Sequence, residues 1–153
     1  LDPQEWVQTP DRLVILFEQM SHYRIIYTDG RPHADDARDY PSWMGHSIGR
    51  WEGDTLVVET RNLTSRATDR TVTTFGAGRA TTVVERFTRS SADTIDYEIT
   101  ITDPTEYSAS WTAAIPMTTL GGQLYEYACH EGNYSMEGVL SGARYQESQE
   151  AQR

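Results

Sequence analysis

The strongest constraint in this sequence is an alternation of apolar and polar residues with a period of two. It is clearest where Ile95, Tyr97, Ile99 and Ile101 alternate with polar residues. Such alternation places every second side chain on the same face of a β-strand. A helical period is missing until residues 136–153, where a weak pattern interrupted by two glycines predicts one or two turns of helix and then a frayed tail. The sequence therefore predicts an all-β protein with a short C-terminal helix.

Turn signals divide the alternating segments into four hairpins. Gly53, between Glu52 and Asp54, supplies the positive φ that a tight turn requires. Four hairpins give about eight antiparallel strands in a simple meander. A meander with one apolar face buries that face either by closing into a barrel, lipocalin-like in architecture, or by packing as a flattened sandwich. The predicted hairpins span residues 12–30, 47–60, 81–104 and 107–131.

Length and composition narrow the class of protein. The 153 residues fit a single domain, residues 1–153. A net charge of −10 disfavours nucleic acids and anionic membranes as partners, and no apolar run approaches the roughly 20 residues of a membrane-spanning helix. The only cysteine, Cys129, excludes an internal disulfide and a cysteine-based zinc site. The absence of lysine excludes Schiff-base chemistry on a lysine.

The candidate catalytic residues lie where strands are expected to end. In an up-and-down meander the even-numbered strands end at the same rim, so His33, after the second strand, and His130, at the end of the eighth, are expected to share that rim. Glu131 follows His130, and a carboxylate beside a histidine fixes its tautomer and raises its basicity. His130 is therefore the candidate general base, Glu131 its orienting partner and His33 the acid or a second ligand contact. The alternative is structural: His130 donates to a backbone carbonyl and Glu131 pairs with an arginine.

Further residues are candidates for holding a ligand at the same rim. Two long connections, residues 28–47 and 61–80, are of a length usually found in functional or disordered loops. The guanidinium groups of arginines can bind a carboxylate on a ligand, and an asparagine amide can polarise a carbonyl. The alternative is that the arginines pair with the many acidic residues of the chain. The predicted ligand-binding residues are Arg31, Trp43, His46, Arg50 and Asn133.

No metal or other cofactor is predicted. The spacings HxH and HExxH, which bind metals, do not occur. A divalent ion held by His33, His46, His130 and Glu131 is the alternative, because imidazole and carboxylate groups are common ligands.

Five stretches together resemble one family of proteins: TDGRPH, WMGHSIGRWEGDTLVVET, VVERFTR, ITDP and YEYACHEGNY. They are similar, in the same order, to segments of small exported bacterial proteins from soil and environmental bacteria, over residues 8–146. The resemblance implies a periplasmic or secreted protein whose leader has been removed, and it implies no activity, cofactor or catalytic residue. Gly49 and Trp51 also resemble the Gly-x-Trp motif of lipocalin-like barrels, a likeness of architecture only.

These observations lead to two hypotheses of function. The first is a β-barrel that binds a small polar or aromatic molecule outside the cytoplasm, with hydrolase or lyase activity as its enzymatic version. The second is a structural or accessory subunit of an extracellular or membrane-attached assembly, in which exposed strand edges bind neighbours or further copies of the chain.

Overall fold

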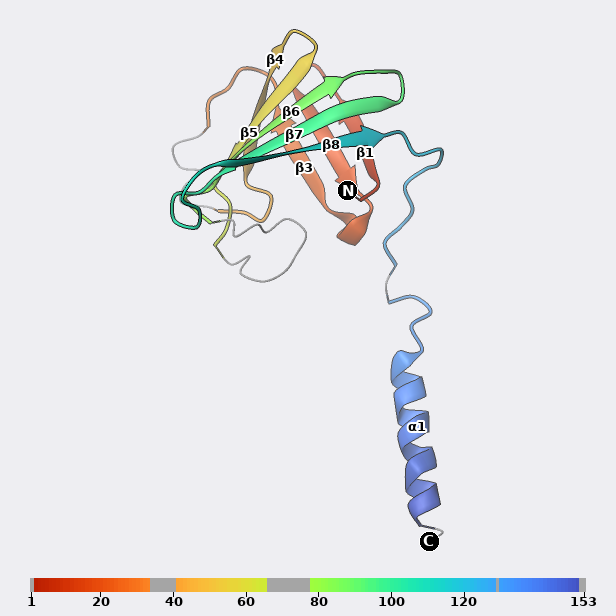
Figure 1. Ribbon diagram of the computed structural model, residues 1–153. Coiled ribbons are helices and arrows are strands. Elements are labelled where there is room, and N and C mark those ends of the chain that lie inside the picture. Colours follow the sequence, from red (N-terminus) through yellow and green to blue (C-terminus); the bar gives the residue numbers. More distant parts are fainter. Residues whose placement is uncertain (1, 34–40, 66–77, 129, 152–153) are drawn as a thin grey trace.

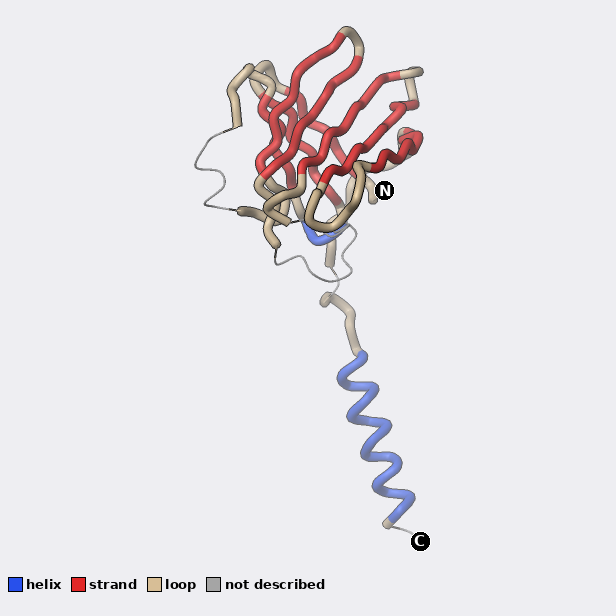
Figure 2. Tube along the Cα trace, turned by 60° about the vertical axis from the view of Figure 1, so that its left-hand side comes forward, coloured by secondary structure: helices blue, strands red, loops and turns tan. Residues whose placement is uncertain are grey.

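The computed structural model describes residues 2–33, 41–65, 78–128 and 130–151. One mixed sheet curls into a half-barrel, and a single helix stands away from it (Figures 1 and 2). The predicted all-β fold with a short C-terminal helix is therefore confirmed. The elements are β1 (Gln4–Gln8), β2 (Arg12–Phe17), the 3₁₀ turn η1 (Gln19–Ser21), β3 (Tyr23–Tyr27), β4 (His46–Glu52), β5 (Thr55–Arg61), β6 (Thr82–Arg89), β7 (Thr94–Thr102), β8 (Trp111–Thr118) and α1 (Ser135–Glu150).

Strand order follows chain order, with one exception to the predicted antiparallel meander. β3 and β4 run parallel and are paired only through Ile26 with Ser47 and Tyr27 with Ile48. A parallel neighbour needs a crossover connection of about a dozen residues or more. The long connection 28–45 supplies that crossover, so its length has a topological cause.

Three of the four predicted hairpins form, as β2–β3, β4–β5 and β6–β7. The fourth was predicted wrongly: β8 forms, but residues 123–128 and 130–131 contain no strand. β1 supplies the remaining strand instead and pairs with β2. Because β1 and β8 each have one partner in the described sheet, its two outer edges remain open and the barrel is only half formed.

The apolar core lies on the concave face of the curled sheet. The register puts the same face of successive strands together, as in Leu13 beside Ile26 and Leu56 beside Phe87. At Gly49 an added Cβ would lie 2.9 Å from Cγ2 of Ile26, so only glycine permits the close approach of β4. The buried core residues are Leu13, Ile15, Ile26, Leu56, Val58, Phe87 and Tyr97.

Aromatic contacts bridge the concave face of the sheet. The Trp6 ring of β1 meets the Phe87 ring of β6 edge-on, with 5.1 Å between the ring centroids. Phe87 in turn stacks on Tyr97, with its centroid at 4.9 Å. These contacts show that the curl brings β1 over β6, although four strands separate them in the sheet order.

A polar layer crosses the same concave face. Arg24 of β3 forms a two-pronged ion pair with Glu85 of β6, including a bond of 3.0 Å from Nη1 to Oε1, and the two side chains are only 11% and 6% exposed. Arg24 also donates to Ser47 and Thr60, at 3.0 and 2.6 Å. The Tyr97 hydroxyl donates to Glu85 at 3.0 Å, and burial raises the pKa of Tyr97 far above its ordinary value, so it remains a donor. The buried charges are thus compensated and hydrogen-bonded.

Helix α1 contributes nothing to this core. It is 16 residues long, longer than the one or two turns predicted, and none of its residues is buried. Gly138 and Gly142 lower its intrinsic stability without ending it.

Replacing Glu85 with alanine tests the polar layer. The substitution leaves Arg24 buried without its counter-charge, so we expect a loss of about 3–5 kcal/mol in the free energy of unfolding, measured by urea denaturation. Glu52→Ala is the matched control, because Glu52 pairs with Arg50 and Arg86 in solvent, and we expect little change. The double variant Arg24→Met, Glu85→Leu removes both charges and is expected to regain most of the loss. Equal stability of the Glu85→Ala and Glu52→Ala proteins would contradict this account.

Candidate functional site

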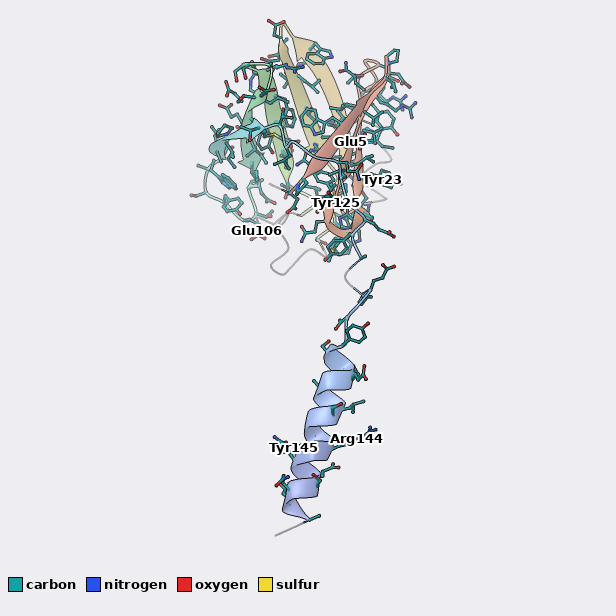
Figure 3. The ribbon with its side chains drawn as sticks, turned by 90° about the vertical axis from the view of Figure 1, so that its right-hand side faces the viewer. Glu5, Tyr23, Glu106, Tyr125, Arg144 and Tyr145 are labelled. Atoms are coloured by element: carbon teal, nitrogen blue, oxygen red, sulfur yellow. The ribbon has the colours of Figure 1, made fainter. Side chains whose placement is uncertain are left out.

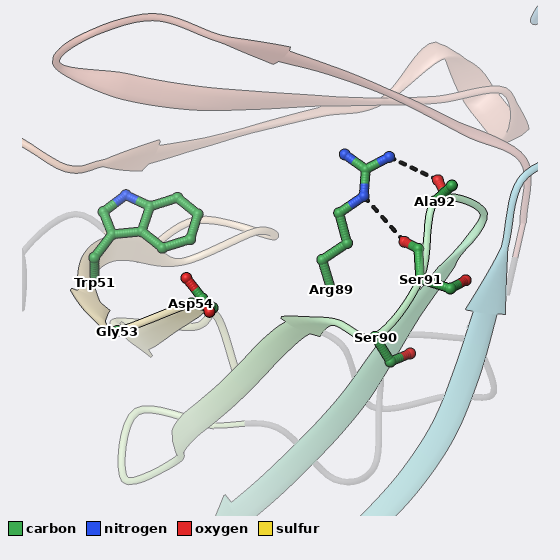
Figure 4. A pocket seen from close by; sticks show the side chains of 7 residues that line it. All are labelled: Trp51, Gly53, Asp54, Arg89, Ser90, Ser91 and Ala92. Atoms are coloured by element: carbon green, nitrogen blue, oxygen red, sulfur yellow. Dashed lines mark hydrogen bonds between the residues drawn. The ribbon is translucent and has the colours of Figure 1, made fainter.

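A hollow opens at the rim of the half-barrel where the β4–β5 and β6–β7 hairpins turn (Figure 4). Its volume is about 590 Å³. Trp51 reaches it because β4 pairs with β3 only at its beginning, so the end of β4 extends beyond β3 and leaves Trp51 54% exposed. The hollow is lined by Trp51, Gly53, Asp54, Arg89, Ser90, Ser91 and Ala92.

A second hollow adjoins the first and leads toward the core. It has a volume of about 170 Å³ and shares Trp51, Asp54 and Arg89 with the outer hollow. Its floor is apolar, as is common where a small molecule binds through its apolar body and a few polar groups orient it. The remaining lining residues are Trp6, Gln8, Leu13, Thr28, Leu56, Phe87 and Ile95. We call the two hollows together the mouth.

Arg89 supplies a fixed cation at the mouth. Its Nε donates to the carbonyl of Ser91 at 3.1 Å and its Nη2 to the carbonyl of Ala92 at 2.6 Å. Figure 4 shows the other terminal nitrogen pointing away from the turn, on the side of Trp51. Among the described residues no carboxylate lies within ion-pair distance of Arg89. The guanidinium can therefore donate to an acceptor on a ligand that lies against Trp51.

A histidine pair occupies the opposite, convex face. The Nδ1 atoms of His33 and His46 lie 2.8 Å apart. The buried Nε2 of His33 lies 3.4 Å from Oε1 of Glu59, an ion-pair contact without the alignment of a hydrogen bond. Glu59 is held in turn by Arg61, whose Nε lies 2.6 Å from the same carboxylate oxygen. His46 stacks on Tyr27, with 5.6 Å between the ring centroids.

The surroundings of His33 favour its neutral form. Burial is the largest cause that lowers the pKa of His33, and the neighbouring His46 lowers it further. Glu59 acts in the opposite direction but does not reverse the shift. At 2.8 Å one Nδ1 of the pair carries a hydrogen and the other presents its lone pair.

The structure does not bring His130 and Glu131 to this pair. Both are exposed and follow residues 123–128, which form no strand. Figure 3 shows Tyr125 still beside the sheet, where its N–H donates to Glu18 at 3.2 Å, whereas Arg144 and Tyr145 lie far out on α1. The predicted shared rim is wrong for two reasons: the eighth predicted strand is not formed, and the parallel β3–β4 pair breaks the alternation of strand directions.

The predicted arginines are each occupied by a carboxylate. Arg31 is paired with Asp29, with Nε 2.9 Å from Oδ1, and lies 4.0 Å above the Tyr27 ring. Arg50 is paired with Glu52 at 2.8 Å. The structure thus matches the alternative raised from the acidic composition, in which arginines find partners within the protein.

The other predicted ligand contacts lie apart from one another. Trp43 is 64% exposed and lines neither part of the mouth. Asn133 accepts from the N–H of Ser135 at 3.1 Å, at the beginning of α1. Among the predicted site residues, the structure brings the side chains of His33 and His46 into contact.

Sequence reasoning did not select Trp51, Asp54 or Arg89 as site residues. The sequence does carry a signal for Trp51 and Arg89. Each lies on the same face of its strand as the buried residues, close to the end of that strand. What alternation does not show is that β4 extends past β3 and leaves this end uncovered.

Two negative findings apply to the described ranges. No group of three or more His, Cys, Asp and Glu side chains among them is arranged to hold a metal ion. None of the helices found there has the length and apolar character required to cross a membrane.

Comparison of the chain with protein-family models, with curated proteins and with solved structures gave no match.

Proposed function

We propose that this protein binds a small aromatic molecule with a polar end at the mouth of its half-barrel, and that it does so outside the cytoplasm. The observation that carries the proposal is Trp51, a half-exposed indole over an apolar hollow beside a cation that has no carboxylate partner among the described residues. An indole left in solvent at the open end of a core offers stacking area at little cost in conformational entropy. The extracytoplasmic location is supported by the likeness of the sequence to exported bacterial proteins.

The lining residues specify the chemistry of the ligand. Trp51, Trp6 and Phe87 suit a flat apolar body that enters toward the core. Arg89 suits an acceptor or anionic group at the outer end, while Asp54 suits a hydroxyl or amine donor. Such a division, with an apolar floor and polar groups at the opening, matches the general anatomy of small-molecule sites.

Binding is a better proposal than turnover. The acid–base set of His130, Glu131 and His33 has no common location in which to act on one substrate. The mouth itself lies on the concave face, away from the histidine pair on the convex face.

Replacing Trp51 tests the mouth. Titration with 8-anilinonaphthalene-1-sulfonate, a flat apolar probe with an anionic end, is expected to show one bound probe per chain by fluorescence. We expect Trp51→Ala to weaken binding about tenfold or more, which corresponds to about 1.4 kcal/mol, and Arg89→Gln to weaken it as well. Trp43→Ala is the matched control. Trp43 is 64% exposed, compared with 54% for Trp51, but it lies outside the mouth, so we expect no change in binding. Binding that survives Trp51→Ala, or that falls equally in Trp43→Ala, would contradict the proposal.

A second candidate function is supported by helix α1. Met136, Val139, Leu140 and Ala143 are spaced three and four residues apart, so they share one face of the helix. Met136 and Val139 are 70% and 67% exposed, and Leu140 is 49% exposed. An apolar helix face without cover is typical of a surface that docks on another protein, so we propose a role as a subunit of an assembly as the alternative.

Mass in solution distinguishes the two candidates. If α1 joins copies of the chain, light scattering coupled to gel filtration is expected to give an oligomer that Leu140→Glu reduces to a monomer. Gln149→Glu adds the same charge on the opposite face of α1 and is expected to leave the oligomer intact. A wild-type monomer at all concentrations would count against self-assembly through this helix.

A further inference from the structure

The histidine pair on the convex face takes no part in the proposed function of the mouth. We propose that His33 and His46 form a two-histidine site for a divalent transition-metal ion that prefers square-planar or tetragonal coordination, Cu²⁺ being the representative. Their Nδ1 atoms are the ligands that the described residues supply.

His33 takes the tautomer that its neighbours favour. Its Nε2 faces the carboxylate of Glu59 at 3.4 Å, so the favourable arrangement has hydrogen on Nε2. Nδ1 of His33 then presents its lone pair toward His46. A ring that directs one nitrogen at a carboxylate and the lone pair of the other outward is the arrangement found in metal-ligating histidines.

His46 can change its tautomer. Its Nδ1 lies 2.8 Å from that of His33 and donates to it while no cation is present. A neutral imidazole can carry its hydrogen on either nitrogen, so moving that hydrogen to Nε2 gives a second lone pair on the Nδ1 side. In the hydrogen bond the two nitrogens point at each other, so the rings must turn for both lone pairs to meet at one ion. No proton has to be lost from the pair for a cation to bind between the rings.

The separation of the two nitrogens selects the class of ion. Metal–nitrogen bonds of about 2.0–2.1 Å that meet at 90° place two nitrogens about 2.9 Å apart, whereas tetrahedral geometry requires about 3.3 Å. The observed 2.8 Å separation therefore matches neighbouring positions of a square-planar ion once the rings have turned, and matches tetrahedral zinc less well.

The rings are also held in place by their surroundings. Tyr27 stacks against His46, and the Arg31 guanidinium lies over the Tyr27 ring, 4.0 Å from its centroid. Arg61 pairs with Glu59, whose carboxylate lies 3.4 Å from Nε2 of His33. This outer set makes the site partly preorganised, and the net charge of −10 attracts cations to the protein as a whole.

The experiment is calorimetric titration of the untagged full chain with Cu²⁺, with Zn²⁺ as a second ion. We expect one strong Cu²⁺ site per chain, with nitrogen hyperfine structure from two imidazoles in the electron paramagnetic resonance spectrum. His33→Gln and His46→Gln are each expected to weaken binding at least tenfold. His22→Gln, which removes an exposed histidine of another loop, is the matched control and is expected to bind as the wild type does.

Glu59→Gln tests the supporting contact separately. Loss of a partner that orients a ligand typically costs tenfold to 100-fold in metal affinity, so we expect a decrease of that size while both histidines remain ligands. The absence of a strong Cu²⁺ site in the wild type would overturn the proposal. A site that persists in both His33→Gln and His46→Gln would overturn it as well, and the circular dichroism spectrum of each variant establishes that the fold is retained.

Discussion

The ion pair between Arg24 and Glu85 is the constraint on which the curvature of this protein depends. The two residues belong to β3 and β6, which are separated by β4 and β5 in the sheet. Neighbouring strands lie about 4.8 Å apart, so in a flat sheet these backbones would be about 14 Å from each other. A direct guanidinium–carboxylate contact needs a shorter path across the concave side. Arg24 crosses β4 and β5 on its way to Glu85, donating to Ser47 and Thr60, and the curl shortens that path, so the pair stabilises the curled form of the sheet.

The curl explains why a core exists without a second layer. Trp6 reaches Phe87 across the concave face, so the sheet covers itself at one end. Helix α1 does not help, because all of its described residues are exposed. The core is correspondingly small and continues directly into the mouth, where Leu56 and Phe87 form part of the floor. The same apolar face that stabilises the fold thus becomes the proposed binding surface at its open end.

Much of this architecture was predictable from alternation alone, and the failures have physical causes. The inward rows of β6 and β7 follow directly from the period of two, and Glu85 within such a row already required a buried cationic partner. Alternation does not specify whether neighbouring strands run parallel, because a strand has the same pattern in both directions. The length of the 28–45 connection indicates a parallel neighbour, since an antiparallel hairpin would need only a few residues. Residues 123–128 alternate as a strand does, but they form no strand in the structure.

The two proposed sites are separated by the geometry of one strand. His46 begins β4 and Trp51 lies near its end, five positions apart. An odd spacing puts the two side chains on opposite faces, and a rise of about 3.3 Å per residue puts them about 17 Å apart along the strand. Neither site can contact a ligand at the other. What they share is the short parallel pairing at Ser47 and Ile48, which fixes His46 beside Tyr27 and lets the far end of β4 extend beyond β3. The one departure from a simple meander therefore creates both the histidine pair on the convex face and the open mouth on the concave face.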